Sequence, residues 1–357
     1  MGTGLDAVTY SAANARLRGQ RAKLLDGEVW RDLLASKDYA AALDVLRRTA
    51  VGQVLSAQDV AHLTVEDVER HLYARLADSH LRAMAFLRGP RRDLLVVLWQ
   101  RFELNNLKAL FRGLEQQMDI GRLRRYLTPL GDFSTLPWDA LMHERTVVGL
   151  IDLLRETHYI NPLRNALPMY QRDGSLFGLE VALDIRYYRD LAAAVNKLHG
   201  SDHREARRVV GTRIDLLNVS WAYRFREYYK LSPEEIVNYT LWRTFRTDTA
   251  LVRRIAMGAD PRQVLRDLLG SDVDVEQIGD WEEDSARGLI KLEMALDRYY
   301  YRTALRESAG YPFRLGVILG YLGLLQYEAR DLVTLLEGKT MGWDAARIRE
   351  HLIRDEE

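Results

Sequence analysis

Three acidic side chains recur in this sequence at an almost constant spacing. Asp215 follows Glu103 by 112 residues, and Glu328 follows Asp215 by 113. A carboxylate can serve as a general acid or base when a pocket brings it close to a second titratable group. Copies that are related by an internal repeat would form either three separate sites or one ring of acids on a central axis.

A short polar residue follows each acid after three positions, about one helical turn later. Together, the repeated positions are Glu103, Asn106, Asp215, Asn218, Glu328 and Asp331. Buried amides and carboxylates need hydrogen-bond partners. We therefore interpret the six residues as structural anchors. Each acid would bind an arginine or cap a neighbouring helix within its own repeat, and each amide would join two helices. The alternative is an all-helical enzyme that uses the acids around a central pocket.

The residues around these positions repeat as well. The segment 101–112 aligns without a gap on 213–224, with an arginine at both ends and the acid, a leucine and the asparagine between them. The third copy begins at Glu328, but it has Asp331 in place of asparagine and Glu337 in place of the final arginine. The motif is therefore strongest in its first two copies.

A second motif supports the same period independently. Six identical residues of the segment 180–188 recur in 293–301, all 113 positions later. A period of this length has the size of a small domain, which is far longer than the unit of a solenoid repeat. It predicts three similar parts around a pseudo-three-fold axis. The positions of the motifs place the parts at 1–132, 133–244 and 245–357.

Other patterns that could carry chemistry are incomplete. Gly338-Lys339-Thr340 resembles the end of a phosphate-binding loop, but the glycine that this loop needs five residues earlier is Val333. We interpret Gly338 as a glycine at a helix C-terminus. Cysteine is absent, and the eight histidines are scattered, so we predict them to be surface or helix-end residues. We expect no catalytic residue, metal site, cofactor or small-molecule substrate.

Composition restricts the class of protein. Apolar residues make up 47% of the chain and charged residues 29%, which is typical of a globular fold. Lysine plus arginine equals aspartate plus glutamate at 51 each, and this balance argues against a nucleic-acid partner. The longest apolar run, 315–325, is shorter than the roughly 20 residues that a membrane helix needs. We therefore expect no membrane span.

Nearly every segment has the apolar spacing of an amphipathic helix, and strand patterns are scarce. Thr64 and Ser232 each precede an acid at the third helical position, and Asp260-Pro261 places a capping residue before a first-turn proline. Three glycines at 316, 320 and 323 would let two helices approach closely. We interpret the tyrosines at 187–188 and 299–301 as core residues. These features predict an all-α fold.

The order of the motifs over the whole chain resembles the C subunit of the bacterial and archaeal V-type (A-type) ATPase, and it is similar to the d subunit of the eukaryotic vacuolar ATPase. The matching features are Tyr10, the segment 14–18, Leu24-Leu25, the Glu-Leu-Asn-Asn-Leu-Lys helix at 103–108, the repeated tyrosine pairs and the Tyr-Glu-Ala-Arg-Asp-Leu helix at 327–332.

The resemblance implies a funnel-shaped, non-catalytic rotor subunit. Its expected partners are the central-shaft subunits and the membrane proteolipid ring, with the membrane subunit of the stator as a further contact. It implies a peripheral position on the cytoplasmic face of the membrane. There the subunit would couple ATP hydrolysis or synthesis to the transport of protons or sodium ions. The alternative is a soluble helical scaffold or adaptor that is unrelated to the ATPase.

Overall fold

The computed structural model describes residues 10, 19–52, 63–241, 245–278, 281 and 284–354. In this part of the chain every regular element is helical, and none is a strand, which confirms the all-α prediction. No helix of the described part is both long and apolar enough to span a bilayer.

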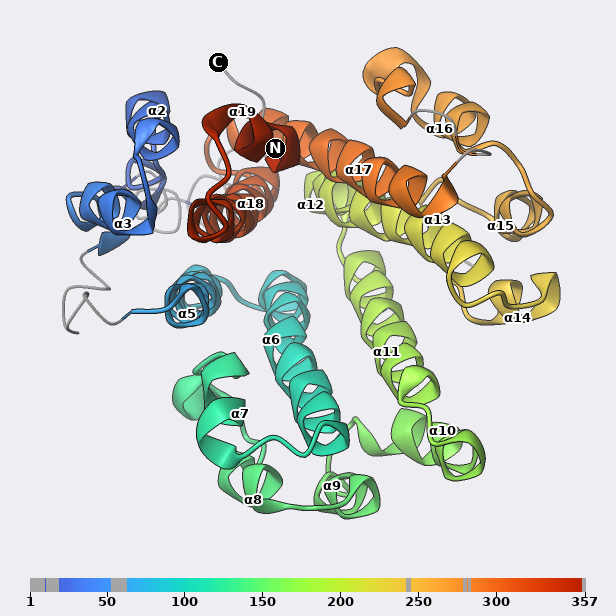
Figure 1. Cartoon of the computed structure of the whole chain (residues 1–357). Helices are drawn as coiled ribbons and strands as arrows, with labels where there is room; N and C mark the ends of the chain where they lie inside the picture. The colour runs from blue at the N-terminus through green and yellow to red at the C-terminus, as the bar shows by residue number, and fades with distance from the viewer. Residues whose placement is uncertain are drawn as a thin grey trace.

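Six long helical segments form the body of the molecule (Figure 1). They are α5 (Val65–Met84), α6 (Pro90–Glu115), α11 (Phe177–Asn196), α13 (Thr212–Glu227), α17 (Ser285–Ser308) and α18 (Leu315–Thr340). A π-helical turn at Arg207–Gly211 joins α13 to the preceding α12 (Gly200–Ala206), so that these three elements form one long helix.

The ends of the long helices recur at the period of the sequence. Helices α5, α11 and α17 end at Met84, Asn196 and Ser308, which are 112 residues apart. Helices α6, α13 and α18 end at residues 115, 227 and 340, which are 112 and 113 residues apart. The order of long elements is therefore the same in all three stretches of chain.

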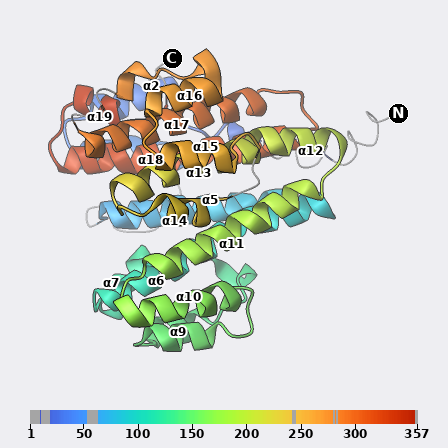
Figure 2. The ribbon, with the colours of Figure 1, turned by 90° about the vertical axis from the view of Figure 1, so that its right-hand side faces the viewer.

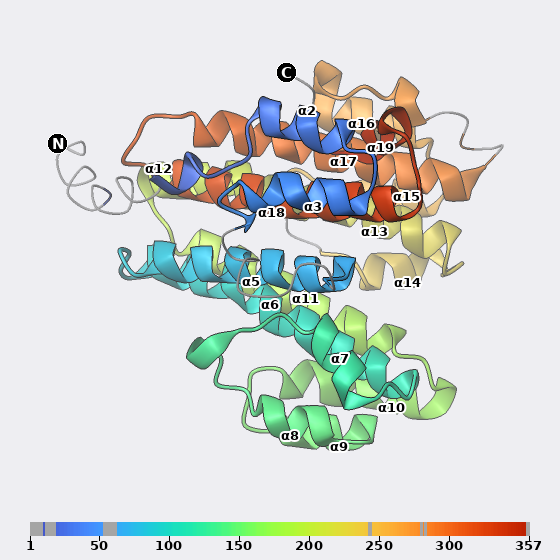
Figure 3. The ribbon, with the colours of Figure 1, turned by 60° about the vertical axis from the view of Figure 1, so that its left-hand side comes forward.

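Packing joins these helices into a closed circuit. Helix α5 packs on α6, α6 on α11, α11 on the π turn that precedes α13, α13 on α17, α17 on α18, and α18 on α5. Seen from the side, the long helices lie in layers that run across the width of the molecule (Figures 2 and 3). The circuit thus brings the last long helix back to the first.

The short helices lie outside the long ones and gather at three corners in Figure 1. They are α2 (Gly27–Ala35), α3 (Tyr39–Arg47), α7 (Ile120–Tyr126), α8 (Trp138–His143), α9 (Val147–Leu153), α10 (Ile160–Asp173), α14 (Pro233–Asn238), α15 (Thr249–Ala256), α16 (Pro261–Leu269) and α19 (Ala345–His351). Three 3₁₀ turns, at Gly131–Phe133, Gly270–Asp272 and Glu276–Ile278, complete the elements.

The helix starts that the sequence predicts are confirmed. Thr64 and Asp67 form a complete capping box at the start of α5, and Ser232 and Glu235 form another at the start of α14. The Asp260 side chain accepts a hydrogen bond from the Arg262 amide before α16. Each of these side chains binds a backbone N–H that has no partner within its own helix.

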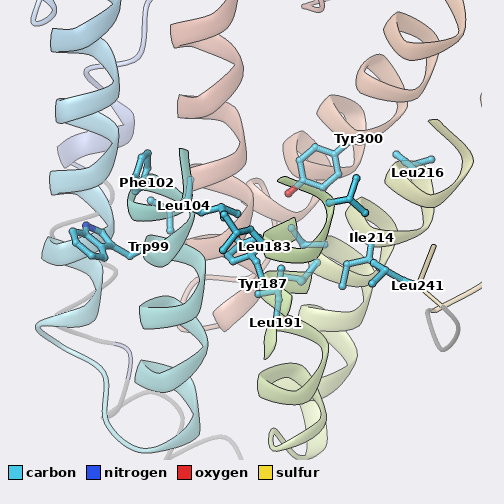
Figure 4. Packing of buried hydrophobic residues seen from close by; sticks show 14 of the residues in the cluster. Trp99, Phe102, Leu104, Leu183, Tyr187, Leu191, Ile214, Leu216, Leu241 and Tyr300 are labelled. Carbon is cyan, nitrogen blue, oxygen red and sulfur yellow. The ribbon is translucent and has the colours of Figure 1, made fainter. Parts of the chain in front are cut away.

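The core has two connected groups of apolar side chains. The larger one fills the space between the long helices, with Trp99, Phe102, Leu183 and Tyr187 near its centre (Figure 4). The smaller one joins α2, α3 and the start of α5 to α18 and α19. The tyrosine prediction is confirmed at Tyr187 and Tyr300, which are both 7% exposed.

The glycines of α18 permit its close contact with α17, as predicted. A Cβ on Gly320 would lie 2.6 Å from the Ala304 carbonyl oxygen and 2.6 Å from the Ser308 nitrogen. A Cβ on Gly323 would lie 3.0 Å from the Ala304 side chain. The histidine prediction is wrong for His80, which lies in the middle of α5 and is only 4% exposed.

Candidate functional site

Asp215 is the most heavily hydrogen-bonded of the six repeated polar residues. It is 1% exposed on α13. Its carboxylate accepts hydrogen bonds from the backbone amides of Phe245, Arg246 and Thr247 at 2.8–3.1 Å, and from the Thr247 hydroxyl at 2.9 Å. Successive N–H groups that converge in this way form a concave anion site. The carboxylate therefore fixes the stretch of chain that leads into α15.

The two asparagines make one identical contact. Asn106 accepts from the Thr128 amide at 2.9 Å and donates to the Thr128 carbonyl at 2.8 Å. Asn218 does the same with Leu241, at 2.9 and 2.8 Å, and also donates to the Thr247 hydroxyl. An amide side chain suits this role because it carries one acceptor and one donor group.

Asp331 shows why the third copy differs. Its two carboxylate oxygens accept from two successive backbone amides, those of Ile353 and Arg354, both at 3.0 Å. An aspartate has only acceptors when ionised, so it matches two N–H groups where the asparagines match one N–H and one C=O. Burial raises the pKa of Asp331, and the two N–H bonds partly offset this effect.

Glu103 is held by hydroxyl groups. It is 6% exposed, and it accepts hydrogen bonds from Ser134 Oγ at 2.5 Å and Tyr159 Oη at 3.0 Å. Trp138 Nε1 in turn donates to Ser134 Oγ at 2.8 Å. Burial raises the pKa of Glu103, against the lowering effect of the two hydroxyl bonds.

Glu328 joins the two ends of the described chain. Its side chain accepts from the Leu25 amide at 2.7 Å and from Arg75 Nη1 at 3.0 Å. Burial raises the pKa of Glu328, while the Arg75 guanidinium and the Leu25 amide lower it. The contact spans 303 residues of sequence between Leu25 and Glu328.

Each acid thus binds a segment beyond the boundary predicted for its own repeat. Glu103 reaches 134 and 159, Asp215 reaches 245–247, and Glu328 reaches 25 and 75. The expectation that every acid finds its partner within its own repeat is therefore wrong. The physical reason is that each acid lies well inside a long helix, where its side chain meets the chain that belongs to the next group of short helices.

Two cations that the sequence analysis did not single out make a related contact. Lys339, which is 7% exposed, donates through Nζ to the carbonyls of Leu34 and Ser36 at the end of α2. Arg226, 113 positions earlier, donates to the Ile255 carbonyl at the end of α15. Cations bind the unpaired carbonyls of a helix C-terminus favourably. Their shared spacing of 113 was the only signal in the sequence.

The ion pairs between neighbouring long helices are complete at two interfaces only. Arg112 binds Glu180 at 2.6 Å, and Arg224, at the equivalent position, binds Glu293 at 2.5 Å. At the third interface the corresponding residue is Glu337, whose negative charge contributes to a raised pKa of Glu69, after burial. Two like charges therefore face each other where the other interfaces have opposite charges.

Replacing Glu337 by Arg is expected to stabilise the protein. The change removes a repulsion with Glu69 and permits the ion pair that the other two interfaces have, for a gain of about 0.5–1 kcal/mol at this exposed position. Chemical denaturation at low and high salt measures it, and the gain should shrink in salt. Glu115→Arg, at the end of α6, is the control. An equal gain in both variants would contradict the pairing.

His80 predicts a specific loss of stability in acid. Burial lowers its pKa from 6.5 to about 4. The folded protein therefore keeps this imidazole neutral, and its stabilising effect is complete above pH 6.5 and is lost as the pH falls towards 4. The loss is on the order of 3 kcal/mol. His80→Gln should reduce the fall in unfolding free energy between pH 7 and 4.5, whereas the exposed control His143→Gln should not. Parallel curves would refute this assignment.

The anchors do not assemble one reaction centre. Asp215 and Asn218 share the Thr247 hydroxyl, but all six residues bind backbone or neighbouring side chains in their own surroundings. None of them is among the residues that line the cavity between the long helices. In the described part of the chain no cluster of three potential metal ligands occurs. The geometry can join helices, and their role as structural anchors remains our interpretation.

Comparison with known proteins identifies the family. The family model described as ATP synthase (C/AC39) subunit matches residues 13–351. The chain belongs to this family. It is therefore a structural, non-catalytic subunit of a rotary ATPase, and its partners lie within that membrane-associated complex.

Curated relatives agree over almost the full length. The chain is 25% identical to the A-type ATP synthase C subunit of Methanocaldococcus jannaschii over 353 residues, which cover 98% of this chain and 87% of the relative. It is 26% identical to the same subunit of Halobacterium salinarum, with 96% and 97% covered. The V-type ATP synthase C subunit of Deinococcus radiodurans is 28% identical over 58% of each chain.

Proposed function

We propose that this subunit is the rotor part that couples the central shaft of a V/A-type ATPase to the proteolipid ring of the membrane sector. It would transmit torque between ATP hydrolysis or synthesis in the head and proton or sodium transport in the membrane. It would lie on the cytoplasmic face, and its three helical repeats would surround a pseudo-three-fold axis as a funnel. Family membership and the closed circuit of long helices support this proposal.

The observation that carries the mechanical part is the closure of the circuit. A coupling element has to resist twisting, and an open chain of helices would yield at its free edge. Here α18 contacts α5, Glu328 binds Leu25 and Arg75, and Lys339 caps α2. These contacts tie the last long helix to the first elements, so that load on one helix pair is shared by the others.

The proposal also needs two docking ends. Helix α18, with 26 residues, is about 39 Å long at 1.5 Å per residue. Exposed apolar side chains lie at both of its ends: Tyr311 before its start is 70% exposed, and Met341 after its last residue is 65% exposed. Tyr228, at the equivalent end of α13, is 75% exposed. One end would meet the shaft and the other the ring.

Removal of the subunit tests coupling directly. An ATPase complex that lacks this chain should still hydrolyse ATP in its head, but it should lose ATP-driven ion uptake into vesicles. Adding the purified chain back should restore uptake. Hydrolysis and uptake that remain coupled without it would contradict the proposal, as would failure of the chain to co-elute with the shaft subunits and with the ring from the same genome.

The absence of cysteine permits a test of the two ends. Tyr311→Cys and Met341→Cys each introduce a single thiol that can be cross-linked in the assembled complex. One variant should cross-link to a shaft subunit and the other to the proteolipid. Val148→Cys, on the outer helix α9 and 41% exposed, is the control and should cross-link to neither. Cross-linking of both ends to the same partner would contradict the arrangement.

A further inference from the structure

A cavity lies at the centre of the circuit of long helices. Its volume is about 50 Å³, it is partly open, and α5, α6, α11, α13, α17 and α18 all contribute to its wall. A site that holds one water needs roughly 10–15 Å³ by the same kind of measure, so this space holds several water-sized groups. It is too small for a helix, whose diameter is about 10 Å, and it is therefore no socket for a shaft.

The polar part of its wall consists of hydrogen-bond donors. Two guanidinium groups, those of Arg101 and Arg213, line the cavity together with the amide of Gln326. These three residues occupy equivalent positions, 112 and 113 apart, on the three long helices that face one another. Histidine and tyrosine side chains complete the polar wall, and no carboxylate lines it.

The charges around the cavity do not balance. Arg213 binds Asp297 at 2.7 Å, but the same carboxylate also binds Arg330 at 2.8 Å. Arg101 donates to Gln326 Oε1 at 2.8 Å, and among the described residues no carboxylate lies within ion-pair distance of it. Three guanidinium groups thus share one carboxylate, which leaves an excess of two positive charges.

Unused hydroxyl groups face the same space. Tyr187 and Tyr300 line the cavity, and in the described part of the chain neither hydroxyl donates to a protein acceptor. Figure 4 shows the Tyr300 oxygen directed from α17 towards the side where Tyr187 lies. A phenol at the edge of a polar cavity ordinarily finds a partner. These hydroxyls and the two guanidinium groups therefore present several donors to one small volume.

We propose that this central cavity binds a small dianionic oxyanion of the phosphate or sulfate type. Such an ion balances the two excess charges, fits a cavity of this volume, and supplies oxygen acceptors for both guanidinium groups and the tyrosine hydroxyls. Bound there, it would connect three long helices at one point, those that carry Arg101, Arg213 and Tyr300.

Calorimetric titration of the full-length chain with inorganic phosphate, and separately with sodium sulfate, tests the site. Chloride is held at matched ionic strength, because phosphate and sulfate also stabilise proteins in general through exclusion from their surface. Arg101→Gln places at this position the residue that the third repeat already has in Gln326. Arg92→Gln, at an exposed position of the same helix, is the matched control.

The wild-type chain and Arg92→Gln should bind one ion with the same affinity, and Arg101→Gln should bind it at least about tenfold more weakly. Tyr300→Phe changes no charge and removes one donor, so it should weaken binding by a smaller factor, and it keeps the test decisive if Arg101→Gln fails to fold. Absence of saturable binding to the wild type overturns the proposal. Equal affinities of Arg101→Gln and Arg92→Gln would show binding elsewhere and also overturn it.

Discussion

Asp215→Asn is expected to lower the free energy of unfolding by about 3 kcal/mol. The carboxylate accepts hydrogen bonds from three successive backbone amides and one hydroxyl while only 1% exposed. The asparagine keeps one acceptor, but its NH₂ group would face N–H donors. Buried amides of 245–247 would then lose their partner, and the start of α15 would be released from α13. Chemical denaturation monitored by circular dichroism measures the loss.

The control for this substitution is Asp152→Asn. Asp152 is exposed on the outer helix α9, so the same chemical change should alter stability by less than about 0.5 kcal/mol. For a chain of this length, each kcal/mol moves the melting temperature by only about 1–2 °C. Denaturant unfolding is therefore the sharper measurement. Equal effects of the two substitutions would rule out the buried anchor role.

Gly320→Ala should also destabilise the protein, by about 2–3 kcal/mol, although alanine is the better helix former. The added Cβ would lie 2.6 Å from two backbone atoms of α17, at Ala304 and Ser308. Backbone atoms cannot rotate away, so the two most closely packed helices would have to separate. That separation would disturb the core on both sides of α18.

Gly27→Ala is the matched control. Gly27 is the first residue of α2, and a Cβ there would meet no atom within 4 Å. The same substitution should be neutral or slightly stabilising at that position. If Gly320→Ala were as stable as Gly27→Ala, the distance between α17 and α18 would have to be adjustable, and a stiff circuit would lose its support.

Much of the fold could be predicted because it is encoded locally. Apolar spacing and capping residues such as Thr64, Ser232 and Asp260 act within one turn of helix, so they are visible in a single sequence. The glycines of α18 also indicated close packing. The buried position of His80 could not be predicted, because it depends on which face of α5 meets α6, and that choice is made by tertiary packing.

The candidate anchors could be found by their spacing, but their partners could not. Asn106 and Asn218 bind a backbone unit 22 or 23 residues away, and no side chain in the sequence marks such a partner. The direction in which the acids reach depends on how each group of short helices folds back on the preceding long helix. The same reason hid Lys339, whose acceptors are carbonyl groups at the end of α2.

The contact between Leu25 and Glu328 also has a consequence for synthesis on the ribosome. Helices α2 and α3 are made first, but the α18 surface that covers Leu33 and Leu46 is made about 300 residues later. At roughly 5–20 residues per second, that interval is on the order of 15–60 s. During this time the earliest helices of the nascent chain keep their apolar faces uncovered. The N-terminal end is therefore the part of this chain that is most exposed to chaperones and to aggregation before release.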